Sequence, residues 1–510
     1  MRTRERAISS VPMMILRVIY GIVIIAIQIY IYYLLFFMSL KIPHILTFIN
    51  IIGLILAIFV YRSNRNISYK LSWIIIILFF NFAGVMAYIA FGHGDSIPRR
   101  KNRELRKYYG QIVINNNVLD EIKEVDMNAY KIANLIVNDI NFPIFKNTQV
   151  AFLSDGKEKY KFLIRDLKEA KEYIFLEYFI VADGVIWEEI KNILIAKAKE
   201  GVIIKMIYDD VGSKPVLNVW KIKQLNQINN IEIVAYNPLG VNLSISLNYR
   251  DHRKIVIIDG KVAYNGGINL ADEYFHIKDR FGFWRDNAIR LSGDAVDSYL
   301  RLFCQMWYMS TKQMLDISSF RRYSSIKSNG YVLPFGDGPG SRKYTSYTLF
   351  KQLINQADKY LYISTPYFII DSEFIQQIIT ACKSGIDVKI LIPYIPDKKM
   401  IYLVTLAHLG KIIKAGGKVY AYKPGFNHAK TVISDDKYAF IGTVNVDYRS
   451  MFLHFECGNF LYNNDCIKDM KEDFLKAVNE SEIISYERWE KRAISTKVLD
   501  FILTVLAPLM

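Results

Sequence analysis

Two segments of the chain carry histidine, lysine and asparagine at matching spacing. The first, HRKIVIIDGKVAYNGGIN, contains His252, Lys254, Asp259, Gly266, Gly267 and Asn269. The second, HAKTVISDDKYAFIGTVN, contains His428, Lys430, Asp435, Gly442, Thr443 and Asn445. Each histidine precedes its lysine by two positions, and residues two apart on a strand face the same side. We therefore expect each histidine and lysine to project together into one pocket.

This set of residues suits displacement at a phosphodiester, which needs a nucleophile, a proton donor for the leaving alkoxide and positive charge on the phosphate oxygens. Two imidazoles can divide the first two tasks because histidine titrates near neutrality. The paired lysines and asparagines can surround a phosphate without a metal ion or another cofactor. Each half also offers an acidic residue downstream, Asp286 and Glu456, to orient and tune an imidazole.

A single His-x-Lys on a strand is most often an ordinary exposed pair, and the aspartate and glycines alone are most often turn residues. Duplication of the whole pattern favours the catalytic interpretation. The other histidines lack such a context, and we expect them to be structural or peripheral; they are His44, His93, His276, His408 and His454. Cys457 is expected to serve packing, and the four cysteines show no metal-ligand spacing.

The segments lie in a repeat of short strands and amphipathic helices. Residues 167–210 and 354–394 each read as an apolar strand, a helix, a glycine and a second β-branched strand. Such units are typical of a mostly parallel sheet covered by helices. The sequence therefore predicts an α/β fold with two duplicated halves, 148–329 and 330–485. Hairpin turns at Asp259 and Asp435 are expected to return each asparagine to its own histidine.

The N-terminal part is far more apolar. Three runs, Val18–Met38, Ile42–Tyr61 and Leu71–Phe91, are each long enough, at 1.5 Å per residue, to cross a hydrocarbon core of about 30 Å. A core helix rarely stays apolar on every face, and a cleaved signal peptide would be shorter. We expect a membrane segment over 1–94 with two to three transmembrane helices, followed by a basic, polar linker over 95–147.

Most of the positive charge lies in the same region. The net charge is +16, and the residues through Lys107 account for +11 of it, from fourteen basic and three acidic side chains. This distribution favours contact with anionic lipid headgroups over nucleic acid. Seven basic residues fall on each side of three spans, so the positive-inside rule gives no orientation. The C-terminal segment 486–510 is equally compatible with an interfacial helix and with a helix docked on the core.

The doubled His-x-Lys-x4-Asp pattern with its trailing glycine and asparagine resembles the phospholipase D superfamily. The segments NYRDHRKIVIIDGKVAYNGGINLADEY, WRDNAIRLSG and the terminal LAPLM are similar to those of bacterial cardiolipin synthases. The resemblance covers nearly the whole chain from about Leu71. The sequence departs from the family at Asn81, where a proline is usual, and at Gly267 and Thr443, where serine is common.

The resemblance implies condensation of two phosphatidylglycerol molecules to cardiolipin and glycerol through a phosphohistidine. It implies His252 as nucleophile and His428 as general acid and then base. Lys254, Lys430, Asn269 and Asn445 would bind the phosphate, and Asp286 and Glu456 would pair with the imidazoles. The aspartates Asp259 and Asp435 would be mainly structural.

Three alternatives stay open on the sequence. A hydrolytic phospholipase D would carry the same motifs, and so would a phosphatidyltransferase that uses another alcohol. A non-catalytic binder of anionic lipid or nucleic acid could retain the fold, although intact motifs in both halves count against it. The resemblance also implies a multi-pass protein of the cell membrane with its catalytic halves in the cytoplasm. The oligomeric state is left open.

Overall fold

The computed structural model describes residues 43–63, 65–92, 117–238, 248–323, 326–339 and 344–509, with four isolated positions between 30 and 37. The chain divides into two compact units. The N-terminal unit comprises residues 1–94, 239–247 and Leu509, and the larger unit contains the rest. Apart from those four positions, the expected span Val18–Met38 lies outside the described residues.

The described part of the N-terminal unit is helical: α3 (Pro43–Arg62), α4 (Ile67–Phe79), α5 (Asn81–Ala87) and the π-helical turn η1 (Tyr88–Gly92). The expected span Leu71–Phe91 is therefore not one helix, because it divides at Phe80. A Cβ on Gly84 would lie 2.2 Å from the carbonyl oxygen of Ile76, so α5 folds back closely against α4. Within the described residues, no helix satisfies the combined length and hydropathy of a membrane span. The expected membrane spans thus stay a prediction.

The larger unit begins, in its described part, with two helices where a polar linker was expected. These are α7 (Asn117–Val125) and α8 (Met127–Ile140). Ile132, Ala133 and Ile136 of α8 are fully buried in the core. Apolar residues spaced three and four apart give α8 one buried stripe, so this part of 95–147 belongs to the folded core.

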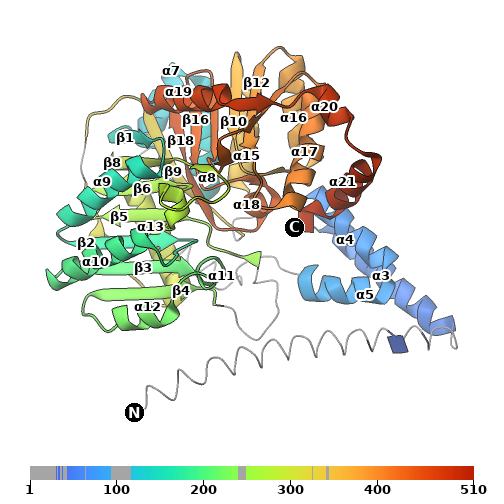
Figure 1. Ribbon diagram of the computed structural model, residues 1–510, viewed down its shortest axis with the longest axis horizontal. Coiled ribbons are helices and arrows are strands. Elements are labelled where there is room, and N and C mark those ends of the chain that lie inside the picture. Colours follow the sequence, from blue (N-terminus) through green and yellow to red (C-terminus); the bar gives the residue numbers. More distant parts are fainter. Residues whose placement is uncertain are drawn as a thin grey trace. The chain divides into compact units, whose positions relative to one another are not determined.

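The first half is built on a seven-stranded sheet (Figure 1). Its strands in spatial order are β1 (Thr148–Leu153), β8 (Ala288–Gly293), β6 (Val262–Gly266), β5 (Lys254–Ile258), β2 (Tyr173–Tyr178), β3 (Ile203–Asp209) and β4 (Ile231–Tyr236). Its main helices are α9 (Gly156–Glu169), α10 (Val185–Lys199), α12 (Val219–Leu225) and α13 (Val296–Thr311). The motif segment supplies β5 and β6.

The second half repeats this arrangement in an eight-stranded sheet. In spatial order the strands are β19 (Ser481–Ile483), β13 (Lys418–Tyr422), β12 (Asp387–Pro393), β10 (Tyr360–Ser364), β15 (Thr431–Ser434), β16 (Tyr438–Gly442), β18 (Glu456–Tyr462) and β9 (Tyr331–Asp337). Its main helices are α15 (Thr345–Asn355), α16 (Ser372–Lys383), α17 (Lys399–Lys414) and α19 (Cys466–Asn479). The duplicated α/β fold expected from the sequence is confirmed.

The prediction of mostly parallel sheets was wrong. In the first sheet only the β2–β3 and β3–β4 pairs, among the described strands, are parallel, and the other pairs are antiparallel. The helical crossovers produce the parallel pairs. The strand that follows each histidine instead returns through a tight turn at Asp259 or Asp435, and a tight turn joins antiparallel strands. The sheets are therefore mixed.

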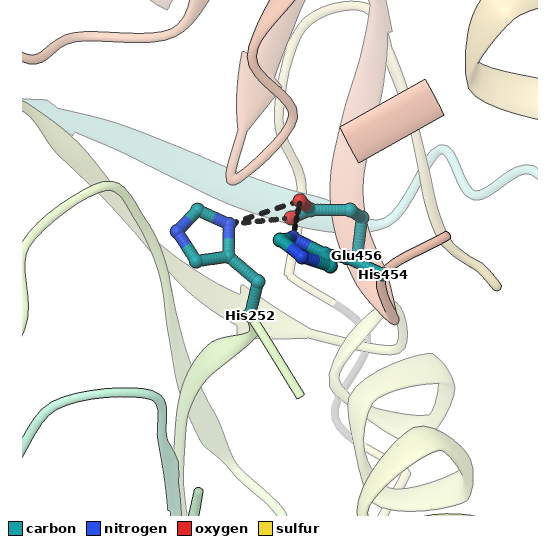
Figure 2. A group of neighbouring side chains, drawn as sticks. All are labelled: His252, His454 and Glu456. Carbon is teal, nitrogen blue, oxygen red and sulfur yellow. Dashed lines mark hydrogen bonds and ion pairs between the residues drawn. The ribbon is translucent and has the colours of Figure 1, made fainter. Parts of the chain in front are cut away.

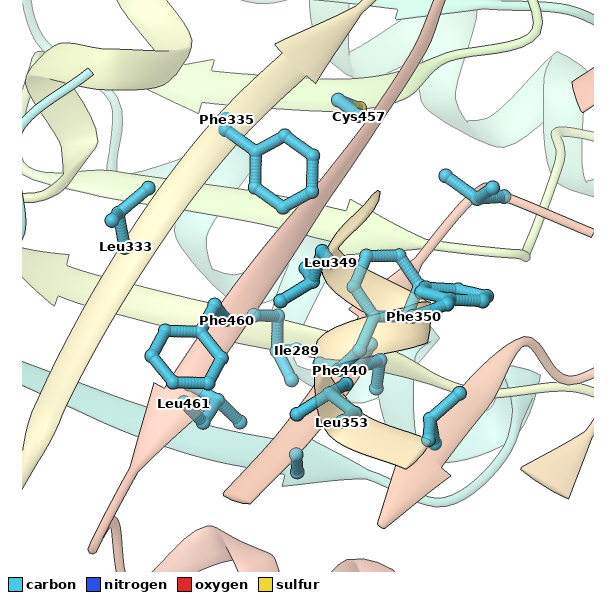
Figure 3. Close-up of a cluster of buried hydrophobic side chains, with 14 of the residues drawn as sticks. Ile289, Leu333, Phe335, Leu349, Phe350, Leu353, Phe440, Cys457, Phe460 and Leu461 are labelled. Atoms are coloured by element: carbon cyan, nitrogen blue, oxygen red, sulfur yellow. The ribbon is translucent and has the colours of Figure 1, made fainter. Parts of the chain in front are cut away.

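The two halves share one hydrophobic core. Ile289 of β8 packs in the same cluster as Phe335, Phe440 and Phe460 of the second half (Figure 3). The contact is also polar, because the Asn459 side-chain amide donates to Asn265 Oδ1 over 3.1 Å. Packing across this core fixes the two motif segments against each other.

Candidate active site

Both motif histidines line one cavity of about 620 Å³, together with Asn269 and Asn445. His252 lies two residues before β5, and His428 lies between β14 (Gly425–Asn427) and β15. Each motif therefore brings its histidine to the end of a strand that is central to its own sheet. The cavity wall also includes apolar and aromatic side chains, among them Phe179, Trp284 and Ile401.

His252 pairs with a carboxylate from the other half. Its Nδ1 lies 2.9 and 3.0 Å from the two carboxylate oxygens of Glu456, the first residue of β18 (Figure 2). The His252 backbone N–H donates to the carbonyl of Phe455 over 2.9 Å, which holds the two segments in register. Because Nδ1 faces the carboxylate, Nε2 is the ring nitrogen available to a substrate.

His428 shows the reciprocal pairing. Its Nδ1 lies 2.6 Å from Oδ2 of Asp286, which belongs to the first half. The strand β14 runs parallel to β7 (Phe283–Arg285), and the His428 N–H donates to the carbonyl of Arg285 over 2.7 Å. The sequence did not indicate which carboxylate serves which imidazole; the structure pairs them crosswise.

The two motif lysines are buried and hold equivalent positions. Lys254 Nζ donates to the carbonyl of its own His252 over 2.5 Å, and Lys430 Nζ donates to that of His428. Burial lowers the pKa of Lys254 to about 8, although Glu456 and Asp286 oppose the shift. Burial likewise lowers the pKa of Lys430 to about 7, against the opposing charge of Asp286. A bound phosphate would favour the charged form of both lysines.

The imidazoles are held in the neutral form by their surroundings. Burial, and after it the charge of Lys430, lowers the pKa of His428 to about 4 against the opposing effect of Asp286. Burial and the neighbouring lysines place the pKa of His252 well below its usual value. Burial raises the pKa of Asp286, but His428 and Lys430 outweigh it, and the net pKa is lowered. Asp286 is therefore ionised and His252 unprotonated at neutral pH.

The motif aspartates lie away from the cavity. The carboxylate of Asp259 accepts the backbone N–H groups of Lys171, Glu172 and Tyr173 over 2.8–2.9 Å. Asp435 accepts those of Asp358, Lys359 and Tyr360 over 2.8–2.9 Å. Each aspartate thereby ties the turn after the motif strand to the start of a neighbouring central strand.

The small residues after the motif strands touch the carboxylates. A Cβ on Gly267 would lie 2.0 Å from Oδ1 of Asp286, so a side chain there would displace the carboxylate. At the equivalent position of the second half, the Thr443 hydroxyl donates to Glu456. Gly266 and Gly442 pack against the next strand, where an added Cβ would meet a carbonyl oxygen at 2.4 and 2.5 Å.

The two asparagines line the cavity but differ in their hydrogen bonds. Asn269 Oδ1 accepts the N–H of Ile180 over 3.0 Å, and its amide donates to the Tyr274 hydroxyl over 2.7 Å. Asn445 is also buried, and its Oδ1 has no hydrogen-bond partner among the described residues. An amide with an open acceptor at the cavity wall can bind a hydroxyl group of a substrate.

Sequence reasoning did not find several residues around the imidazoles. His454, expected to be peripheral, lines the cavity, and its ring centroid lies 5.7 Å from that of His252. Its Nδ1 is 3.8 Å from Oε1 of Glu456 (Figure 2). The two-residue spacing of His454 and Glu456 was the available signal. His428 is instead surrounded by three aromatic rings at 5.5–5.7 Å, those of Tyr274, Trp284 and Phe426.

Ligand atoms of His252, His454 and Glu456 lie within 4.8 Å of one another, close enough to hold a metal ion. The His252 Nδ1 in this group is already bonded to Glu456. The group therefore belongs to the imidazole–carboxylate arrangement of the site. Among the remaining histidines that the structure describes, His408 contacts the Val404 carbonyl within α17, and His276 stacks on Phe283.

A further buried lysine stands behind the cavity. Lys159 Nζ donates to the carbonyl of Ile268 over 3.0 Å and to the Tyr178 hydroxyl over 3.3 Å. Burial lowers its pKa to about 7, with Asp286 opposing. Asp286 therefore interacts electrostatically with Lys159 as well as with the motif residues His428 and Lys430. Cys457 is fully buried and accepts from the Asn265 amide, as suits a packing residue.

Two family models match segments of this chain. A family model described as "Cardiolipin synthase, PLD-like domain" matches residues 163–307 and 350–478, and "Phospholipase_D-nuclease N-terminal" matches residues 45–93. The chain belongs to the phospholipase D-like cardiolipin synthase family. The two matched segments of that family cover both motif histidines and both carboxylates.

Similar proteins extend along most of the chain. Cardiolipin synthase 2 of Bacillus anthracis is 34% identical, with 88% of each chain covered. The major cardiolipin synthase of Bacillus subtilis is 31% identical, covering 91% of this chain and 99% of its own. The crystal structure of a phosphatidylserine synthase from Haemophilus influenzae matches 74% of this chain and 98% of its own, with 17% identity and a TM-score of 0.57, which shows a common fold.

Proposed function

We propose that this protein condenses two phosphatidylglycerol molecules into cardiolipin and glycerol. The observation that carries the proposal is the convergence of two histidines, each paired crosswise with a buried carboxylate, on one cavity beside two buried lysines. That arrangement supplies a nucleophile, a proton carrier and cationic groups for a phosphate at a single point. The similar cardiolipin synthases indicate which phosphodiester and which acceptor are expected.

In the first step, His252 Nε2 attacks the phosphorus of one phosphatidylglycerol. The bond between phosphorus and the glycerol headgroup oxygen breaks as the phosphorus–nitrogen bond forms. His428 gives its proton to that oxygen, and free glycerol leaves. Glu456 accepts the Nδ1–H of His252 and stabilises the positive charge that the ring acquires.

In the second step, a headgroup hydroxyl of another phosphatidylglycerol loses its proton to His428 and attacks the phosphorus. The phosphorus–nitrogen bond breaks, His252 is regenerated, and the new phosphodiester is cardiolipin. One imidazole acts as acid and then as base, so the cycle restores both protonation states. The anionic phosphodiester favours protonated His428 in the first step, because opposite charge raises a histidine pKa.

The remaining site residues are proposed to hold the phosphate and the geometry. Lys254 and Lys430 would neutralise the non-bridging oxygens, and Asn269 and Asn445 would orient the phosphate and the glycerol hydroxyls. Gly266, Gly267, Gly442 and Thr443 would shape the floor of the site. Asp259 and Asp435 would act through the backbone of the motif turns.

A membrane context completes the proposal. We propose that the N-terminal segment anchors the protein in the cell membrane as a multi-pass element, with the catalytic halves on the cytoplasmic side. Its helices α3, α4 and α5 expose large apolar side chains, including Phe48, Phe59 and Phe79. Lipid-bound substrates and the exclusion of water from a phosphohistidine both favour transfer over hydrolysis at such a location.

The proposal is tested with purified full-length protein in vesicles of phosphatidylglycerol carrying a radiolabelled headgroup. We expect cardiolipin and labelled glycerol in equal amounts, with a chelator having no effect on the rate. Phosphatidic acid without cardiolipin would identify a hydrolase instead. A requirement for added serine or ethanolamine would identify another acceptor. The absence of any turnover would indicate a non-catalytic binder.

A further inference from the structure

The C-terminal helix of the larger unit has an inverted polarity. In α21 (Ile494–Leu506) the charged residue Asp500 is buried, whereas five large apolar side chains are exposed, Leu499 and four that share one side of the helix. The exposed fractions are 80% for Ile494, 55% for Val498, 72% for Phe501 and 50% for Ile502. Their spacing of four, three and one places them on one stripe of the helix. We call this stripe the α21 apolar face.

The orientation of α21 is fixed by contacts on its other side. Leu503 and Ala507 pack in a cluster with Ile369, Val404 and Tyr448. Asp500 forms an ion pair with Arg492, at 2.7 Å between Oδ2 and the guanidinium nitrogen. A rotation that buried the apolar face would expose Leu503 and break this ion pair. The exposure therefore follows from the packing of the helix.

The preceding segment secures the helix further. Trp489, in α20 (Tyr486–Glu490), donates its indole N–H to the carbonyl of Leu406 over 2.8 Å. The ring lies so close to α17 that a Cβ on Gly410 would be 1.9 Å from it. The segment is thus clamped onto α17 at two points, and the α21 apolar face is held at a defined place on the larger unit.

The inner side of the helix lies next to the active-site cavity. Ala507, one residue beyond α21, lines that cavity, as do Ile369, Tyr448 and Ile401 from the surrounding elements. Met400, beside Ile401 at the start of α17, is 54% exposed. The buried cluster that holds the inner side of α21 therefore extends to the wall of the cavity, and Met400 adds exposed apolar surface near it.

Positive charge accompanies the apolar surface. Lys398 lines the cavity, Lys399 follows it, and Lys491 precedes α21; all three are exposed. A helix with outward apolar side chains and nearby lysines is suited to lie in the interface of an anionic bilayer. At 13 residues, α21 is about 20 Å long, which is too short to cross a hydrocarbon core.

We propose that the α21 apolar face is a docking surface for the anionic lipid bilayer, which seats the cavity mouth against the membrane. Lipid substrates would then enter the cavity from the bilayer without crossing water. The proposal rests on a lipid substrate and deepens the function proposed above. The proposal combines the two interpretations of residues 486–510, an interfacial helix and a helix docked on the core. One side of α21 packs on the protein, and the other contacts lipid.

The location is tested by depth measurement on full-length protein reconstituted in phosphatidylglycerol-containing bilayers. A nitroxide is attached to a cysteine in place of Phe501, in a Cys382→Ser background, and Trp220→Cys on α12 is the matched control with a 60% exposed side chain. We expect collisions with oxygen to dominate at position 501 and collisions with a water-soluble nickel complex to dominate at position 220. Bilayers of phosphatidylcholine alone should give a shallower position for 501.

Three outcomes would overturn the proposal. A label at 501 that stays accessible to the nickel complex lies in water. A label shielded from both quenchers, with spin–spin coupling between molecules, reports a second copy of the chain. A label shielded equally in detergent, without such coupling, reports cover by another segment of the same chain.

Activity gives an independent test. The double variant Phe501→Asp, Ile502→Asp should lose at least about tenfold in turnover of bilayer phosphatidylglycerol, because two large side chains no longer enter lipid. Turnover of soluble short-chain phosphatidylglycerol should be unchanged, and so should both activities of Trp220→Asp. Equal losses on both substrates would overturn the docking role. Absence of cardiolipin from the unmodified protein on either substrate would instead overturn the proposed function, while the depth measurement would still report the docking.

Discussion

The two imidazole–carboxylate pairs occupy equivalent places in the repeat but have different surroundings. Around His252 the neighbours are mixed: the Phe179 ring lies at 5.0 Å between centroids, Glu456 contacts Nδ1 through both oxygens, and Thr443 donates to the same carboxylate. Around His428 they are aromatic, and Asp286 contacts Nδ1 through one oxygen. Duplication thus preserved the pairing of the two groups and not the means of holding them.

The length of the carboxylate side chain explains part of this difference. Aspartate is one methylene shorter than glutamate. The backbone at Gly267 therefore comes closer to the Asp286 carboxylate than the backbone at Thr443 comes to that of Glu456. Gly267 makes that approach possible, because any Cβ would overlap Asp286. In the other half, the equivalent position has room for Thr443, whose hydroxyl fixes the longer Glu456. Equivalent positions therefore act differently: Gly267 leaves space for its carboxylate, and Thr443 donates a hydrogen bond to its own.

The largest effect should separate the roles of the two histidines. We expect His252→Ala to lower turnover by about 10³-fold or more and to abolish labelling of the protein by phosphatidylglycerol with a radiolabelled phosphate. His428→Gln should lower turnover as much and still allow labelling when an activated leaving group replaces glycerol. Rapid quenching at high pH, where a phosphorus–nitrogen bond to histidine is stable, followed by electrophoresis measures the label. The reverse pattern would exchange the two roles.

The carboxylates should come next. Glu456→Gln and Asp286→Asn keep the shapes but remove the charge that orients and stabilises each imidazole, so we expect losses of about 10²- to 10⁴-fold in kcat. Asp286→Glu should be as damaging as Asp286→Asn, since the close approach of Gly267 leaves no space for a longer side chain. Glu456→Asp should retain more activity than Asp286→Glu. Steady-state kinetics on all four variants test this order.

A smaller effect is expected at the residues that support the carboxylates. Thr443→Ala removes a hydrogen bond to a charged group, worth about 1.5–3 kcal/mol, and should lower kcat about tenfold or more. Gly267→Ala should lower it further by displacing Asp286, whereas Thr443→Ser should be close to the unmodified protein. Equal tolerance of alanine at both positions would contradict the explanation based on side-chain length.

The smallest effect concerns the lysines and appears as a pH dependence of stability. The folded-state pKa values of Lys430 (about 7) and Lys254 (about 8) lie below the value of 10.5 for a free lysine. The unfolded chain therefore binds more protons between those limits, and the free energy of unfolding should rise with pH there. Lys430→Met should flatten the rise from about pH 7, and Lys254→Met from about pH 8. Denaturant titration across pH 6–10 measures both slopes.

The sequence alone was enough to predict the repeat and the motif residues His252, His428, Asn269 and Asn445 that line the cavity. Strand–helix–strand periodicity marks the two halves, and the common spacing after His252 and His428 selects the motif members from ordinary turn and strand residues. Both are local patterns, because they arise from the two-residue and 3.6-residue periods of strand and helix. The departures also follow from local chemistry: the tight turns at Asp259 and Asp435 carried the information that the motif strands are antiparallel.

The tertiary structure decided how the halves complete each other. The exchange of Glu456 and Asp286 between the halves depends on packing across the shared core and on backbone bonds at Phe455 and Arg285, which no spacing within one half encodes. Long-range packing also brings His454 and Trp284 to the cavity, and the separate cluster beneath α21 orients that helix so that Asp500 is buried and Phe501 faces outward. Sequence determined the chemical groups through local periodicity, and long-range packing determined which of them touch.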